Sequence, residues 1–127
     1  LLKNAPDRIG RRKVLCAGLT SMVLGYSGYC TVTAESMWMI LVPAFLCGTG
    51  HGLTYHCMTA LSLQTFPTES RGTGSALSLM AFDCGAVFGM PIMASLVVWQ
   101  GYNMMFLTVA ATVAVISIIY FKQNGIR

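Results

Sequence analysis

Residues 84–121 read CGAVFGMPIMASLVVWQGYNMMFLTVAATVAVISIIYF and contain no Asp, Glu, Lys or Arg. Three further runs, 14–34, 36–68 and 72–82, also lack these four residue types. About 20 apolar helical residues cross the hydrocarbon core of a bilayer, which is about 30 Å thick. Because the runs have this length scale, the sequence predicts an integral membrane protein. No ten-residue segments of alternating hydrophobicity appear, so the spans are expected to be helices rather than barrel strands.

The composition of the whole chain agrees with this prediction. Of the 127 residues, 55% are hydrophobic and 9% are charged, whereas ordinary globular domains carry about 25% charged residues. These values exclude a soluble globular domain, a disordered chain, collagen and a disulfide scaffold. The formal net charge is +4, but the basic residues lie in short clusters between long uncharged runs. We therefore expect no nucleic-acid partner.

Turn and charge signals divide the chain into four predicted transmembrane helices, and the fold class is an all-α integral membrane protein. The expected ranges are about 14–33, 37–63, 72–98 and 103–121. Charged or proline-containing breaks at 33–36 and 66–71 separate the first three helices. Before the fourth, the signal is Gly101 with flanking Trp99, Gln100 and Tyr102, which is typical of an interfacial turn. A loop at 1–13 precedes the helices, and a tail at 122–127 follows them.

With four antiparallel helices, every basic residue falls on the same side of the membrane. These residues are Lys3, Arg8, Arg11, Arg12, Lys13, Arg71, Lys122 and Arg127. Lys and Arg in short loops are enriched on the cytoplasmic side. The sequence thus predicts a multi-pass protein of the cell membrane, plasma or inner, with both ends of this segment in the cytoplasm and the lipid bilayer as a partner.

The cysteines give no sign of a metal or disulfide site. Five of them lie inside the predicted helices, at positions Cys16, Cys30, Cys47, Cys57 and Cys84. They are odd in number and show no C-x-x-C spacing, whereas structural metal sites and disulfide frameworks need defined spacings or matched pairs. We expect no metal and no cofactor. Since no nucleophile and base arrangement is present either, we expect no enzymatic activity.

The second and third predicted helices carry the ionisable residues. Asp83 lies about 16 Å into the third helix, near the bilayer midplane. A carboxylate at that depth costs about 2.5–3.5 kcal/mol on insertion scales, so it needs a partner or a cavity. Apolar surroundings favour a protonated carboxyl group, which suits a proton carrier; a hydrogen bond that ties helices together is the structural alternative. His51, Tyr55 and His56 lie at similar depth on the second helix and are the other candidates for proton coupling or for lining a cavity.

Geometry restricts how these candidates can combine. His51 and His56 are separated by about 140° around a helix, so they cannot both face Asp83. Gly48 with Gly52, and likewise Gly85 with Gly89, have the small-xxx-small spacing that lets a neighbouring helix approach closely. We expect both pairs to serve helix packing.

Several motifs together resemble one transporter family. The segment Asp7-Arg8-Ile9-Gly10-Arg11-Arg12-Lys13 resembles the signature loop of the major facilitator superfamily, which joins two helices on the cytoplasmic side. Further similarity to drug and proton antiporter-like members lies in 50–55, in the helix-start motif with Pro67, Arg71 and Gly72, in 82–89, and in 101–106. The chain is similar to the last third of such proteins, helices nine to twelve.

The resemblance is incomplete at two places. Lys3 and Ala5 stand where the signature loop usually has Gly and Leu, a degeneracy typical of the second copy of the loop. The run Gly85-x-x-x-Gly89-Met90-Pro91 resembles the antiporter motif of helix five instead. Helices three to six are therefore the alternative assignment.

The resemblance implies a twelve-helix secondary active transporter that moves a small molecule by alternating access, with proton-coupled efflux as the expected activity. Asp7, Arg8, Gly10, Arg11 and Arg12 would form a cytoplasmic gate between helix bundles. Leu1 falls directly in a loop, so we expect a fragment whose partners are the substrate, protons and the missing N-terminal helices. The alternative is a free-standing four-helix membrane protein, either a small multidrug-type dimeric transporter or a non-transporting tetraspan scaffold.

Overall fold

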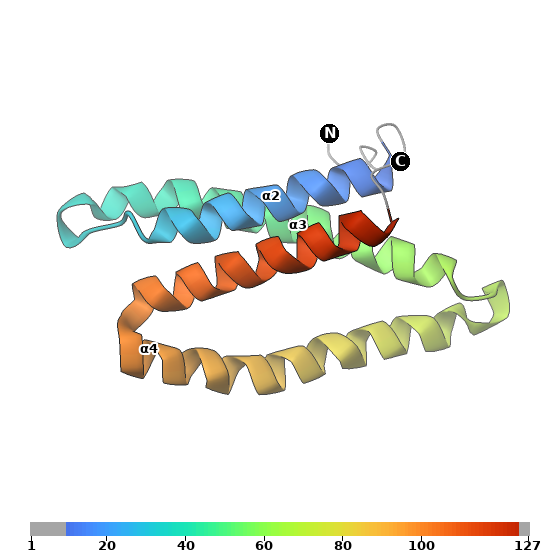
Figure 1. Cartoon of the computed structure of the whole chain (residues 1–127). Coiled ribbons are helices and arrows are strands. Elements are labelled where there is room, and N and C mark those ends of the chain that lie inside the picture. The colour runs from blue at the N-terminus through green and yellow to red at the C-terminus, as the bar shows by residue number, and fades with distance from the viewer. Residues whose placement is uncertain (1–9, 125–127) are drawn as a thin grey trace.

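The computed structural model describes residues 10–124, which are almost entirely helical (Figure 1). Helix α2 spans Arg11–Tyr29, α3 spans Leu41–Gln64 and α4 spans Arg71–Asn124. Two 3-10 turns connect them, η2 at Ala34–Ile40 and η3 at Thr68–Ser70. Helix α2 begins at Arg11, inside the stretch that we expected to be a loop.

Helix α4 consists of two arms that run in opposite directions (Figure 1). Its only non-helical residue is Gly101, with φ 83° and ψ 173°. We call 71–100 the first arm and 102–124 the second arm. The turn expected between residues 98 and 103 corresponds to this one glycine. Because the chain reverses at Gly101, the second arm runs alongside α2, whereas the first arm lies well away from α2 (Figure 1).

The closest packing in the described chain is between α2 and α3, and glycines make it possible. A Cβ atom built on Gly25 would lie 2.9 Å from the backbone nitrogen of Cys47, and one built on Gly50 would lie 2.8 Å from the carbonyl oxygen of Gly18. These separations are too short for any side chain, so the two backbones approach closely because both positions are glycine.

The expected packing role of the two small-xxx-small pairs is wrong within the described chain. Nothing lies within 4 Å of a Cβ atom built on Gly48, Gly52, Gly85 or Gly89. On α3 it is Gly50, between Gly48 and Gly52, that faces α2. Residues two apart on a helix point in very different directions, so only one of these faces can meet a given neighbour.

A small apolar core lies where α2, α3 and the second arm meet. Val14, Leu15 and Cys57 are buried there, and Tyr120 and Phe121 of the second arm pack against them. Toward the other end of α2, the ring of Tyr29 stacks on that of Phe106, with centroids 4.7 Å apart. Contacts near both ends therefore hold the second arm along α2.

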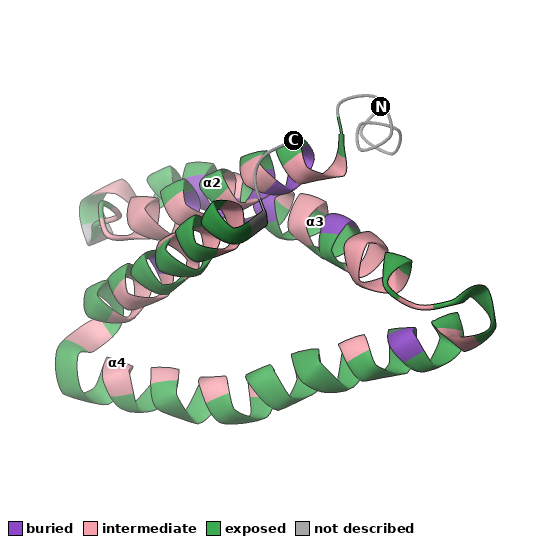
Figure 2. Cartoon of the chain, turned by 45° about the vertical axis from the view of Figure 1, so that its right-hand side comes forward, coloured by how far each residue is buried: buried purple, intermediate pink, exposed green. Residues whose placement is uncertain are grey.

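Most residues of the first arm of α4 are exposed, apart from buried Gly74 and a few half-buried positions (Figure 2). Large apolar side chains on successive faces are open, including Phe82 at 66%, Phe88 at 71% and Trp99 at 86%. A helix that is apolar all round belongs in lipid or among other helices. Two stretches, Glu35–Gln64 and Thr68–Gln123, are long and apolar enough to cross a membrane. Helix α2 is outside this set; it begins with three basic residues and contains several Gly, Ser and Tyr residues.

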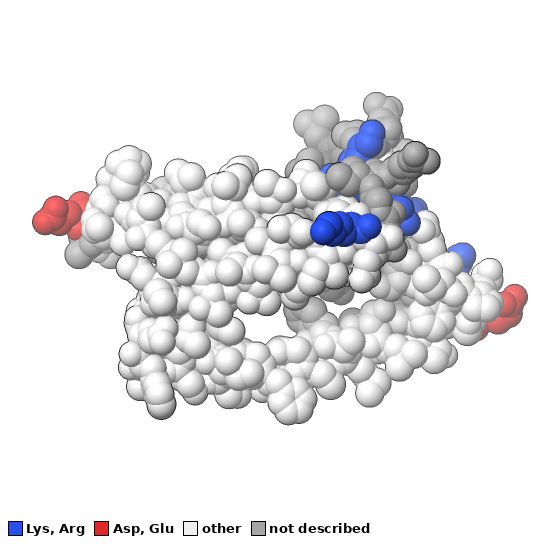
Figure 3. Space-filling view, viewed as in Figure 1, with Lys and Arg blue, Asp and Glu red and all other residues white. Residues whose placement is uncertain are grey.

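Charge is strongly polarised along the bundle (Figure 3). On the face shown, the described Lys and Arg residues gather at the end where α2 begins, and acidic residues mark both far ends. Glu35 lies in η2 and Glu69 lies in η3. The surface between these ends is free of charged groups in this view, as a helix bundle surrounded by lipid would require.

Candidate functional site

The signature segment enters α2 through a glycine that has an unusual backbone conformation. Gly10 has φ 96° and ψ 128°, and its carbonyl oxygen accepts hydrogen bonds from the backbone nitrogens of Lys13 and Val14 at 3.1 and 3.2 Å. A residue with a Cβ atom rarely adopts a positive φ of this kind. Asp7 and Arg8 lie outside the described residues, so the expected gate is seen only from Gly10 onward.

Arg11 and Arg12 form the first turn of α2 and are half-buried. Positive charge is unfavourable at a helix N-terminus, because the helix dipole places partial positive charge there. Capping of the helix therefore does not account for these two residues. Their position at the basic end instead suits an anchor or a contact with another part of the protein.

The helix-start motif joins α3 to α4 through a proline turn. Pro67 precedes η3, and its carbonyl oxygen accepts a hydrogen bond from the backbone nitrogen of Ser70 at 3.0 Å. Arg71 then begins α4 and is exposed, while Gly72 has open space around it. The constrained residue is Gly74, since a Cβ atom there would lie 2.6 Å from the ring of Phe66.

Between the end of α3 and the first arm of α4 lies a groove of about 570 Å³, whose mainly apolar lining also includes polar side chains. Its polar side chains come from both helices: Tyr55, Thr59 and Ser62 from α3, and Ser75, Ser78 and Asp83 from α4. We call this set the hydroxyl groove. Five hydroxyl groups from two largely apolar helices thus line a space that also holds a carboxylate. Such a space can admit water, protons or a polar ligand inside a membrane.

Asp83 is the only charged residue of the hydroxyl groove. It lies about 18 Å along the helix from Arg71, which is close to half the thickness of the bilayer core. Among residues 10–124, its carboxylate has no hydrogen-bond or ion-pair partner. The rings of Tyr55 and Phe82 meet edge to face at the groove, with centroids 6.5 Å apart. The structure therefore brings two of the candidates, Asp83 and Tyr55, to one place.

The histidines lie elsewhere. The Nε2 atom of His51 is 2.8 Å from the hydroxyl oxygen of Tyr26 on α2, and the two rings meet edge to face. His56 contacts the ring of Tyr55, with centroids 5.9 Å apart, but does not line the hydroxyl groove. No histidine pairs with Asp83 in the described part of the chain, and no three metal-ligating side chains gather there.

The family profile of the Major Facilitator Superfamily matches residues 5–125. The chain belongs to the major facilitator superfamily. It is therefore a membrane transporter, and this resolves the choice between a facilitator and an unrelated four-helix protein in favour of the facilitator. Comparison with curated proteins and with solved structures gives no match.

Sequence reasoning missed four of the facilitator's groove residues: Thr59, Ser62, Ser75 and Ser78. A signal was present, because Tyr55, Thr59 and Ser62 follow the i, i+4, i+7 spacing of one helix face. It was weak, since serine and threonine are frequent in membrane helices and bond their own backbone. Ser78 does this here, donating to the carbonyl oxygen of Gly74 at 2.9 Å. Tyr26 was also missed as the partner of His51.

Proposed function

We propose that this facilitator is a proton-coupled secondary active transporter that exports a small molecule by alternating access, and that the hydroxyl groove is part of its translocation path. In this proposal the segment supplies helices nine to twelve of a twelve-helix protein, and the remaining helices are its partners. The segment crosses the cell membrane four times, with both of its ends in the cytoplasm.

One observation carries the proposal: Asp83 lines a groove together with five hydroxyl-bearing side chains. Its distance of about 18 Å along the helix from Arg71 corresponds to about half the bilayer core. A carboxylate in lipid is costly without a partner or a water-filled space. Tyr55, Thr59, Ser62 and Ser75 line the same groove, and hydroxyl groups both donate and accept hydrogen bonds. They can hold the carboxyl group in either protonation state, which is what a group that binds and releases a proton during transport requires.

His51, Tyr55 and His56 have different places in this scheme. Tyr55 lines the groove with Asp83 and is the proposed substrate or water contact. His51 is hydrogen-bonded to the hydroxyl group of Tyr26 on α2. We therefore propose that His51 serves the contact between α2 and α3 rather than proton transfer. His56 is exposed, so its role depends on the helices that complete the bundle. The segment from Asp7 to Arg12 is the proposed cytoplasmic gate, and Pro67, Arg71 and Gly72 set the start of α4.

The test replaces the carboxyl group and keeps its shape. Asp83→Asn in the full-length protein, reconstituted into liposomes with an imposed pH gradient, is expected to reduce gradient-driven uptake of ethidium, a lipophilic cation, to the level of protein-free vesicles. Asp83→Glu is the matched control, since it keeps a titratable carboxyl group and should retain part of the uptake. Uptake by Asp83→Asn that still responds to the pH gradient as wild type does would disprove the role of Asp83.

A further inference from the structure

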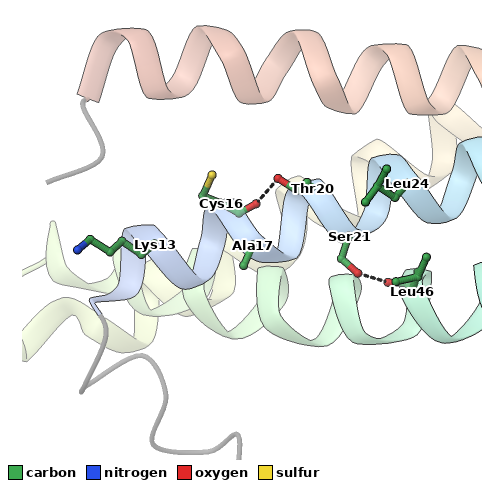
Figure 4. A pocket seen from close by; sticks show the side chains of 7 residues that line it. All are labelled: Lys13, Cys16, Ala17, Thr20, Ser21, Leu24 and Leu46. Carbon is green, nitrogen blue, oxygen red and sulfur yellow. Dashed lines mark hydrogen bonds between the residues drawn. The ribbon is translucent and has the colours of Figure 1, made fainter.

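Two open grooves flank one ridge of α2 at the basic end of the molecule. The first, about 500 Å³, lies between α2 and α3, and its lining includes Lys13, Ala17, Leu24 and Leu46 (Figure 4). The second, about 550 Å³, lies between α2 and the second arm of α4, and its lining includes Leu19, Val23, Ile118, Phe121 and Lys122. Cys16 and Thr20 line both grooves, so the grooves run side by side along the same helix.

The walls of both grooves are apolar in effect, because their hydroxyl groups are already used. Thr20 donates to the carbonyl oxygen of Cys16 and Ser21 donates to that of Leu46, each at 2.8 Å (Figure 4). Ser117 donates to the carbonyl oxygen of Val113. A polar ligand would find few open partners along these walls. Their surface suits hydrocarbon.

Each groove has a lysine at the same end. Lys13 lies in the first turns of α2, and Lys122 lies in the last turn of α4. Both side chains are exposed, and the amino group of Lys13 points away from the apolar lining, past the start of α2 (Figure 4). The paired grooves thus combine two shallow apolar surfaces with two cations at one end, a pattern complementary to an amphipathic anion with two chains.

We infer that the paired grooves bind one anionic phospholipid of the leaflet at the basic end. One acyl chain lies in each groove, on either side of Cys16 and Thr20, and the phosphate lies between Lys13 and Lys122. The length of the groove is close to that of an acyl chain in one leaflet. Cys16 and Leu24 are about 12 Å apart along the helix, and one leaflet contributes about 15 Å of hydrocarbon. Basic pockets between membrane helices are known to recognise such headgroups.

This site is separate from the proposed transport path. No residue lines both the paired grooves and the hydroxyl groove. Bound lipid would hold α2 against α3 and the second arm, and leave the first arm, which carries Asp83, free to move. The inference therefore stands whether or not Asp83 carries a proton.

The experiment measures lipid retained by the full-length protein after purification in detergent. Phosphatidylglycerol and phosphatidylcholine with identical chains are added in equal amounts, and bound lipid is counted by native mass spectrometry. We expect phosphatidylglycerol to be retained preferentially, and Lys13→Gln and Lys122→Gln each to weaken its binding about fivefold. Arg71→Gln is the matched control, because Arg71 lies at the same end but lines neither groove.

A second variant keeps both lysines and fills the grooves. Thr20→Phe is expected to reduce binding of phosphatidylglycerol, and glycerol phosphate, which has the headgroup charge without the chains, should not displace the lipid. Equal retention of the two lipids, or full retention by both lysine variants, would overturn the inference. Displacement by glycerol phosphate would also overturn it, since the site would then bind free phosphate compounds rather than lipid.

Discussion

At the scale of single residues, Gly101 has a backbone conformation that depends on the absence of a side chain. Its φ of 83° and ψ of 173° fall in a region that is essentially restricted to glycine. Gly101→Ala is therefore expected to lower the free energy of unfolding by about 1–3 kcal/mol, measured by thermal unfolding in detergent followed by circular dichroism.

The control for Gly101 is a glycine in regular helix. Gly85 has nothing within 4 Å of its Cβ position, so Gly85→Ala should leave stability unchanged or raise it, because alanine favours helix more than glycine does. If the two variants unfolded at the same temperature, the turn between the arms would not depend on the backbone freedom of Gly101.

The candidate residues could be found from the sequence to the extent that chemistry alone marks them. Asp83 was marked by its charge within an apolar run and Gly101 by its turn signal. The companions of Asp83 were missed because serine and threonine look alike whether they line a groove or bond their own helix. The contact between Tyr26 and His51 joins residues on different helices, and helix periodicity does not specify how two helices are rotated against each other.

At the scale of elements, the contact between α2 and α3 depends on which glycine faces the partner helix. A Cβ atom on Gly50 would lie 2.9 Å from the backbone nitrogen of Met22, whereas Gly48 has open space. Gly50→Val should force the helices apart and destabilise the protein by about 1–3 kcal/mol, the usual range for overpacking. Gly48→Val, on the same helix and with the same change in propensity, should cost less. The reverse order in melting temperature would mean that the other face of α3 meets α2.

Proline, charge and glycine mark the breaks between helices in the sequence, but not the residues at which helices begin and end. Helix α2 ends at Tyr29 rather than near 33, and α3 begins at Leu41 after a 3-10 turn rather than near 37. The start of α2 also differs. Basic residues were assigned to a loop, yet the helix begins at Arg11, where the backbone turns at Gly10. The choice of packing face was the larger error, since Gly48, Gly50 and Gly52 provide glycine on several faces of one helix and the sequence does not show which face a neighbour covers.

At the scale of the whole molecule, the distribution of charge predicts the orientation in the membrane. Every described Lys and Arg lies near a helix end at the basic end of the molecule. The η2 turn, which contains Glu35, lies at the opposite end (Figure 1). Glu69, in the other 3-10 turn, lies close to Arg71 in the sequence, at the basic end.

Since basic loops stay in the cytoplasm, Glu35→Cys in intact cells should react with a membrane-impermeant maleimide, while Glu69→Cys should react only after the membrane is opened. The two variants are matched, because each replaces a glutamate in an exposed 3-10 turn, and the unsubstituted protein gives the background from its native cysteines. Labelling of Glu69→Cys in intact cells, with Glu35→Cys protected, would invert the topology and place the proposed lipid site in the outer leaflet. Labelling of both variants in intact cells would place Glu35 and Glu69 on the same side of the membrane, so α3 would not be a single transmembrane span.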